Sequence, residues 1–123
     1  MVIRTNEYVP ERGDVVWINL DPQAGHEQSG RRPALVLSAF EYNERTGLAL
    51  LCPITSRVKG YPFEVALPPG MVVVGVILAD QIKCLDWWAR NAVFIDKVPE
   101  EPLTEVVRLV HLLLREAPSI GDR

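Results

Sequence analysis

The chain has 123 residues, 48% of them hydrophobic and 24% charged, with a formal net charge of −3. This size predicts one domain over residues 1–123 that buries its own core, with residues 1–7 and 117–123 flexible. No apolar run reaches the roughly 18 residues of a membrane helix. Because residues 1–10 also lack an apolar signal-peptide core, we expect a cytoplasmic protein that makes no membrane contact.

The cysteines and histidines do not form a recognisable metal or redox motif. Cys52 and Cys84 each lie in an apolar run, and a reducing cytoplasm favours two buried thiols over a disulfide or a nucleophile. His26 and His111 have no ligand spacing to each other or to the cysteines. We therefore expect no metal and no other cofactor.

Most of the chain reads as short strands. Apolar runs of strand length recur along it, separated by turn-forming segments such as Lys59-Gly60-Tyr61-Pro62. Strands are predicted at 13–20, 33–38, 47–53, 63–67, 72–78, 81–85 and 92–95. Many short strands with turns between them favour a small barrel or a curled sheet.

Two segments have helical character, 39–45 and 103–114. In the second, apolar residues recur at helical spacing, which predicts a helix packed on the sheet. Pro102 suits the first turn of this helix, and Pro118 marks its far limit. His111 lies near the apolar stripe, so we expect it to be partly buried and without a catalytic role.

Three segments, 25–33, 53–60 and 79–81, concentrate polar residues at the ends of predicted strands. The first reads as a mobile loop flanked by glycines, the second carries hydroxyls and cations, and the third is a polar break in an apolar stretch. Residues 28–60 contain five basic side chains and two acidic ones, in an otherwise acidic protein. A locally basic face of this kind is compatible with phosphate binding.

Together these segments resemble the MazF/PemK family of mRNA interferase toxins, and the resemblance runs from Tyr8 to about Leu114. The stretches that carry it are Arg12-Gly13-Asp14-Val15 with Trp17, Asp21-Pro22, Gly25 with Glu27-Gln28, Arg32-Pro33-Ala34 with Val36-Leu37-Ser38, Pro53 with Thr55, Lys59-Gly60-Tyr61-Pro62-Phe63-Glu64-Val65, Ala79-Asp80-Gln81 with Lys83, Trp87, and Ala89-Arg90. Two positions depart from the pattern: Trp88 stands where relatives carry a cation, and His26 replaces a smaller or less titratable residue.

The resemblance implies a mainly β fold with helices, a curled antiparallel sheet of the SH3-like barrel (CcdB/PemK-like) type with a C-terminal helix. It implies a homodimeric toxin of a toxin–antitoxin system that cleaves single-stranded mRNA at specific sequences. The implied partner is a MazE-like antitoxin whose acidic tail lies over the RNA groove.

The resemblance also assigns the site. Arg32 and Thr55 fall on the family's catalytic arginine and threonine, Glu27 and Gln28 on the substrate-side loop, and Asp80 with Gln81 on the pair that reads bases. With the neighbouring polar and basic side chains, the predicted RNA-binding set is Gln28, Arg31, Ser56, Arg57, Lys59, Asp80 and Gln81.

The residue chemistry supports RNA cleavage through the substrate's own 2′-hydroxyl. Such an enzyme must stabilise charge on the phosphate, accept a proton, and supply one to the leaving 5′-oxygen. Arg32 can donate two hydrogen bonds to phosphate oxygens, and Thr55 can donate one more. Arginine is a poor base, so the proton acceptor is either Glu27 or Arg32 in an unusual environment. Glu27 could instead pair with a neighbouring arginine to order its loop.

Two other functions fit the same sequence. A gyrase-poison-type toxin shares the fold but acts by binding a protein, and it would not need a paired Arg32 and Thr55. A non-catalytic SH3-like binding module would bind RNA or a partner without cutting. Trp87 and Trp88 could stack on bases, although at least one of them is expected in the core or a dimer interface.

Overall fold

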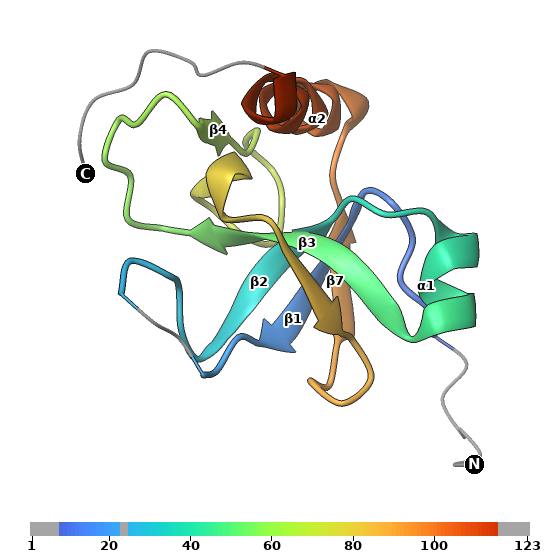
Figure 1. Cartoon of the computed structure of the whole chain (residues 1–123). Helices are drawn as coiled ribbons and strands as arrows, with labels where there is room; N and C mark the ends of the chain where they lie inside the picture. The colour runs from blue at the N-terminus through green and yellow to red at the C-terminus, as the bar shows by residue number, and fades with distance from the viewer. Residues whose placement is uncertain (1–7, 23–24, 116–123) are drawn as a thin grey trace.

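The computed structural model describes residues 8–22 and 25–115. Seven antiparallel strands, two α-helices and one 3-10 turn make up this part of the chain (Figure 1). In chain order they are β1 (Asp14–Asn19), β2 (Arg31–Val36), α1 (Phe40–Thr46), β3 (Leu48–Thr55), β4 (Glu64–Ala66), β5 (Val76–Leu78), η1 (Ala79–Gln81), β6 (Lys83–Asp86), β7 (Val93–Lys97) and α2 (Glu100–Arg115). The predicted curled antiparallel sheet with a C-terminal helix is confirmed. The two terminal segments predicted to be flexible, and Pro118, lie outside the described residues.

Strand β3 is the centre of the sheet, whose strand order is β4-β5-β3-β2-β1-β7. One edge of β3 pairs with β2, in the register Ala34↔Pro53. The other edge pairs first with β6 and then, at Ile54 and Thr55, with β5. The turn η1 joins β5 to β6 along this edge. The polar break predicted at 79–81 is therefore the point where β3 exchanges one partner for another.

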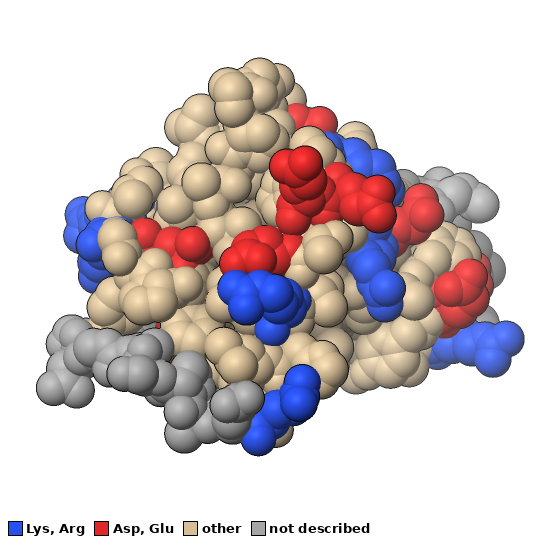
Figure 2. Space-filling model, turned by 90° about the horizontal axis from the view of Figure 1, so that it is seen from above, with Lys and Arg blue, Asp and Glu red and all other residues tan. Residues whose placement is uncertain are grey.

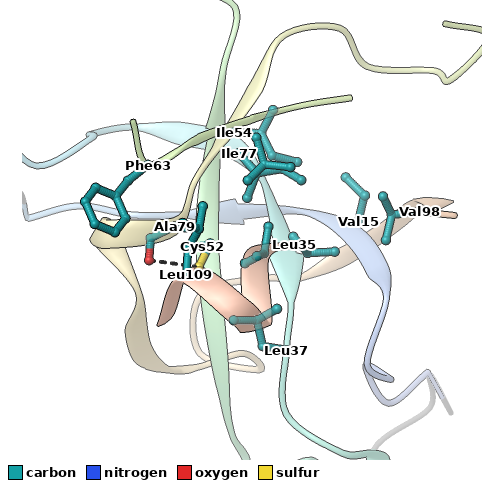
Figure 3. Close-up of a cluster of buried hydrophobic side chains, with 12 residues drawn as sticks. Val15, Leu35, Leu37, Cys52, Ile54, Phe63, Ile77, Ala79, Val98 and Leu109 are labelled. Carbon is teal, nitrogen blue, oxygen red and sulfur yellow. Dashed lines mark hydrogen bonds between the residues drawn. The ribbon is translucent and has the colours of Figure 1, made fainter. Parts of the chain in front are cut away.

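Side chains alternate between the two faces of the curled sheet, and each face has its own core. One core includes Leu35, Cys52 and Ile54 and is covered by Val106 and Leu109 of α2 (Figure 3). The other packs Val16, Ile18, Ala34, Val36 and Leu51 against the indole of Trp87. Trp87 is thus a core residue, as expected for one of the two tryptophans.

The two cysteines differ in their surroundings. Cys52 is fully buried, its thiol points toward the Ala79 carbonyl oxygen at 3.9 Å, and burial raises its pKa to about 12. Such a thiol is unreactive at neutral pH. The expectation of a second buried thiol was wrong, because Cys84 lies on the exposed side of β6.

Two further expectations were wrong. The apolar run 72–78 forms a strand only from Val76 onward, since Gly75 takes a φ of +128° and Val72 and Val74 before it are exposed in a loop. His111 is exposed. His111 comes two residues after buried Leu109. Its side chain therefore projects about 200° further around the helix, away from the core. Within the described residues, no helix is long and apolar enough to cross a membrane.

A buried asparagine ties α1 to the chain segments around it. The Asn43 side chain donates to the carbonyl oxygens of Pro10 and Ser38, at 2.8 and 3.1 Å, and accepts from the Ser38 hydroxyl at 2.6 Å. The backbone carbonyl oxygen of Asn43 accepts a hydrogen bond from the Trp87 indole N–H at 2.9 Å. Asn43 has no exposed surface, so loss of its amide would leave buried polar groups unpaired.

We expect Asn43→Ala to lower the free energy of unfolding by about 2–4 kcal/mol, because three side-chain hydrogen bonds are lost in the interior. The exposed neighbour Glu44 provides a matched control. Glu44→Ala should change the free energy of unfolding by less than about 0.5 kcal/mol. Urea denaturation of both variants measures the difference. Equal stabilities would contradict the anchoring role of Asn43.

Candidate functional site

A cleft of about 460 Å³ opens where β2 begins and β3 ends. Nine of the ten residues predicted for the site line it: Glu27, Gln28, Arg32, Thr55, Ser56, Arg57, Lys59, Asp80 and Gln81. The tenth, Arg31, is outside the lining, and its guanidinium donates to the Asn91 carbonyl oxygen at 2.7 Å. The three polar segments of the sequence thus meet at one site.

The pairing of β2 with β3 brings Arg32 and Thr55 together. Ala34 pairs with Pro53, so the same register carried two residues further places Arg32 opposite Thr55. Opposed residues of an antiparallel pair project from the same face, so both side chains belong to one side of the sheet. They lie at the strand ends, where the ladder between β2 and β3 stops and the cleft begins.

Both side chains are oriented by hydrogen bonds to nearby backbone. The Arg32 Nε–H donates to the Ser29 carbonyl oxygen at 2.8 Å, which fixes the orientation of the guanidinium. Thr55 is buried, and its Oγ1 accepts from the Arg57 N–H at 3.1 Å. This contact occupies an acceptor position on Oγ1, while the hydroxyl proton can still be donated to a ligand.

Gly75 allows the close approach that holds Thr55 in place. A Cβ built on Gly75 would lie 2.1 Å from the Thr55 carbonyl oxygen, far inside contact distance. Its φ of +128° is also one that residues with a side chain rarely adopt. Glycine is therefore required where the loop before β5 passes the end of β3.

The loop between β3 and β4 is fixed by a carboxylate that the sequence analysis did not assign to the site. Glu64 accepts hydrogen bonds from the backbone N–H groups of Lys59 and Gly60, the shortest being 2.9 Å. Glu64 also lines the cleft, as do Tyr61, His26, Ser29 and Leu78. The sequence predicts a turn at Lys59-Gly60-Tyr61-Pro62 and a strand at 63–67, so the short distance along the chain from Thr55 was the available signal for Glu64. Phe63 of this segment is a core residue.

The loop that carries Glu27 and Gln28 also lines the cleft. Glu27 forms an ion pair with Lys83 of β6, with 3.1 Å between Oε1 and Nζ. Lys83 therefore supplies a cation to this carboxylate. The Gln81 side chain contacts the backbone of the same loop at Gln28 and at His26.

The cleft is less basic than the local sequence suggested. Its lining includes the cations Arg32, Arg57 and Lys59 and the carboxylates Glu27, Glu64 and Asp80. On the face seen from above, acidic and basic side chains likewise lie next to one another, between wide uncharged areas (Figure 2). Anion binding in the cleft therefore depends on individual donors and not on a field of one sign.

No set of three or more His, Cys, Asp or Glu side chains is grouped for metal binding within residues 8–22 and 25–115. The cleft offers the Arg32 guanidinium and the Thr55 hydroxyl, which are donors suited to phosphate oxygens. The site as built can bind an anionic group and stabilise added charge on it.

Comparisons with known proteins agree with this geometry. Residues 11–114 match the family described as PemK-like, MazF-like toxin of type II toxin–antitoxin systems. The chain is 46% identical over 109 residues to the endoribonuclease toxin MazF of Escherichia coli K12, a match that covers 89% of this chain and 97% of that protein. It is 36% identical to the endoribonuclease PemK of Escherichia coli, over 85% of this chain and 81% of that protein.

Solved structures give the same result. MazF from Deinococcus radiodurans superposes with a TM-score of 0.86 and 55% identity, covering 88% of this chain and 98% of that one. A MazE-MazF structure from the same organism matches with a TM-score of 0.81 and 53% identity, over 90% of this chain and 100% of that one. By family match, identity and fold together, the chain belongs to the PemK-like, MazF-like toxins of type II toxin–antitoxin systems.

Proposed function

We propose that this endoribonuclease toxin cleaves single-stranded mRNA at specific sequences, without a metal ion, in the cleft lined by Arg32 and Thr55. The observation that carries the proposal is the convergence of these two side chains at the ends of β2 and β3. The relatives named above are endoribonucleases, which disfavours a gyrase poison or a non-catalytic binding module.

The chemistry follows from the donors in the cleft. The 2′-oxygen of the nucleotide before the cut attacks phosphorus, and its proton passes to a base. The bond to the 5′-oxygen breaks, that oxygen takes up a proton, and a 2′,3′-cyclic phosphate remains. Arg32 and the Thr55 hydroxyl donate hydrogen bonds to the phosphate oxygens, where negative charge increases in the transition state.

Two groups remain as proton acceptors. Glu27 lies in the cleft wall, and an ionised carboxylate can accept a proton. Its ion pair with Lys83 fixes the orientation of the carboxylate. Arg32 is the alternative, and it would have to act outside the usual chemistry of a guanidinium.

Binding of the RNA falls to the rest of the lining. Arg57 and Lys59 are exposed at the cleft and suited to phosphates, while Gln28, Ser56, Asp80 and Gln81 were assigned to the RNA from the sequence. Single-stranded RNA is the expected substrate, because its backbone can reach in-line geometry and its base edges are free to be read.

The partners follow from the family and from the surface. The toxin has an antitoxin partner, and MazE-MazF structures are among its structural relatives. We propose that a MazE-like acidic tail covers the cleft, where Arg57 and Lys59 would attract it, and that the protein acts in the cytoplasm, where mRNA is located. A homodimer is supported by exposed apolar side chains on neighbouring positions of β1 and β7, among them Trp17, Val93 and Phe94.

Arg32→Ala and Thr55→Ala should each lower the cleavage rate by about 10²–10³, because each removes a donor to the developing phosphate charge. Thr55→Ser keeps the hydroxyl and should retain most activity. Arg45→Ala, on exposed α1, removes an arginine far from the cleft and controls for net charge. Near-wild-type cleavage by Arg32→Ala or Thr55→Ala would contradict the assignment.

Cleavage should proceed in EDTA and should require the 2′-hydroxyl before the cut bond. An oligonucleotide with one deoxy substitution there should bind and survive, while the unmodified strand is cut. The attacking group is then held beside phosphorus by the substrate itself, and no metal-activated water is needed. Inhibition by EDTA, or equal cutting of the deoxy strand, would mean a metal-dependent hydrolysis instead.

Light scattering at micromolar protein should give the mass of a dimer, because the exposed apolar side chains on β1 and β7 would be buried against a second copy. Trp17→Glu places a charge among them and should shift the equilibrium toward the monomer. A monomer mass for the wild-type chain at these concentrations would refute the homodimer.

A further inference from the structure

We propose that Gln81 and Lys83 form a latch that holds the loop 26–28 in its working position, and that Gln81 acts as a positioning residue and not as a reader of bases. The latch is defined as the Gln81 amide, the Lys83 ammonium and the three consecutive loop residues that they contact. Its catalytic role rests on the ribonuclease activity proposed above.

The first half of the latch is a two-ended contact to the loop backbone. The Gln81 Oε1 accepts from the Gln28 N–H at 3.1 Å, and its Nε2 donates to the His26 carbonyl oxygen at 3.2 Å. One side-chain amide therefore satisfies a backbone donor and a backbone acceptor two residues apart, as a neighbouring strand would do. These contacts join segments that are 53 and 55 positions apart in the chain.

The second half is the ion pair between Lys83 and Glu27, the loop residue between the two that Gln81 contacts. The Lys83 side chain is only 19% exposed, so its ammonium is held close to the protein surface. Lys83 does not line the cleft, whereas Glu27 does. Glu27 is therefore the contact that links Lys83 to the cleft.

The two sides of the latch differ in how firmly they are held. Lys83 is paired with Leu51 in the sheet, and η1 is packed against α2. The loop contains no helix or strand, and it is bounded by Gly25 and Gly30, both at positive φ. A segment of this kind has many accessible conformations, and contacts from a rigid neighbour select one of them.

The position of the loop matters for Arg32 as well as for Glu27. The carbonyl oxygen of Ser29, the residue after the latched segment, accepts the Arg32 Nε–H. Release of the loop would therefore loosen the guanidinium proposed to bind the phosphate and move the carboxylate that is a candidate base. The polar atoms of the Gln81 amide contact the loop. Gln81 could therefore turn them toward a base only if the loop were released.

The test compares Gln81→Leu, which keeps the size of the side chain but removes both hydrogen bonds, with Lys83→Met and with Gln81→Glu. The glutamate variant keeps the acceptor for the Gln28 N–H and loses the donor to the His26 carbonyl. Cys84→Ser, on the exposed side of the same strand, is the matched control. Thermal unfolding of each variant confirms that it is folded.

Amide hydrogen exchange at Gln28, followed by NMR without RNA, measures directly how firmly the hydrogen bond to Gln81 is formed. We expect exchange about three- to tenfold faster in Gln81→Leu than in wild type, and unchanged in Cys84→Ser. In cleavage assays kcat should fall about tenfold in Gln81→Leu and in Lys83→Met with little change in KM. The double variant should lose little more than either single variant, because both act on one loop.

Sequencing of the 5′ ends of the RNA fragments separates positioning from base reading. The latch predicts that Gln81→Leu cuts at the same sequence motif as wild type, only more slowly. A changed motif, or unchanged exchange at Gln28, would overturn the proposal. If the wild-type protein cuts no RNA at all, the ribonuclease proposal fails instead, and the exchange measurement still decides whether the latch exists.

Discussion

The antiparallel register between β2 and β3 is the constraint on which the site depends. It is set by Ala34↔Pro53 and the pairs that follow, deep in the sheet, and it determines what meets at the strand ends. A slip of one residue would turn every side chain of one strand to the other face. The two cores make such a slip costly, because Leu35 and Ala34 are buried on opposite faces. Packing of apolar side chains thus fixes the relation between Arg32 and Thr55.

The second edge of β3 supplies the remaining wall of the cleft. Because β3 exchanges β6 for β5 along this edge, η1 places Asp80 and Gln81 beside the end of the strand. Gly75 lets the incoming chain pass close to Thr55. The balance of charge in the cleft has a local explanation: Glu64 accepts backbone N–H groups and Glu27 pairs with Lys83, which lies outside the lining. These carboxylates organise loops, while Arg32, Arg57 and Lys59 are the groups suited to a phosphate chain.

Much of this could be predicted from the sequence. Strand-length apolar runs gave the strands to within a few residues, and polar breaks in them marked the three segments that form the cleft. The roles of Arg32 and Thr55 follow from the family resemblance, since the register that brings the two residues together is not visible in a single sequence. The errors have physical causes. The run at Val72–Val74 has strand composition, but Gly75 at positive φ interrupts it. Glu64 and Lys83 were missed because each acts through a contact that only the folded chain brings about.

We expect Arg32 and Thr55 together to bind the phosphate at the cut bond. The most direct measurement is a crystal structure of the wild-type protein with an RNA oligonucleotide that carries a single deoxy substitution at the cleavage site. We expect the scissile phosphate within hydrogen-bond distance of both the Arg32 guanidinium and the Thr55 hydroxyl, with the 2′-position before it directed toward Glu27 or Arg32. A scissile phosphate bound elsewhere, out of reach of both side chains, would contradict it.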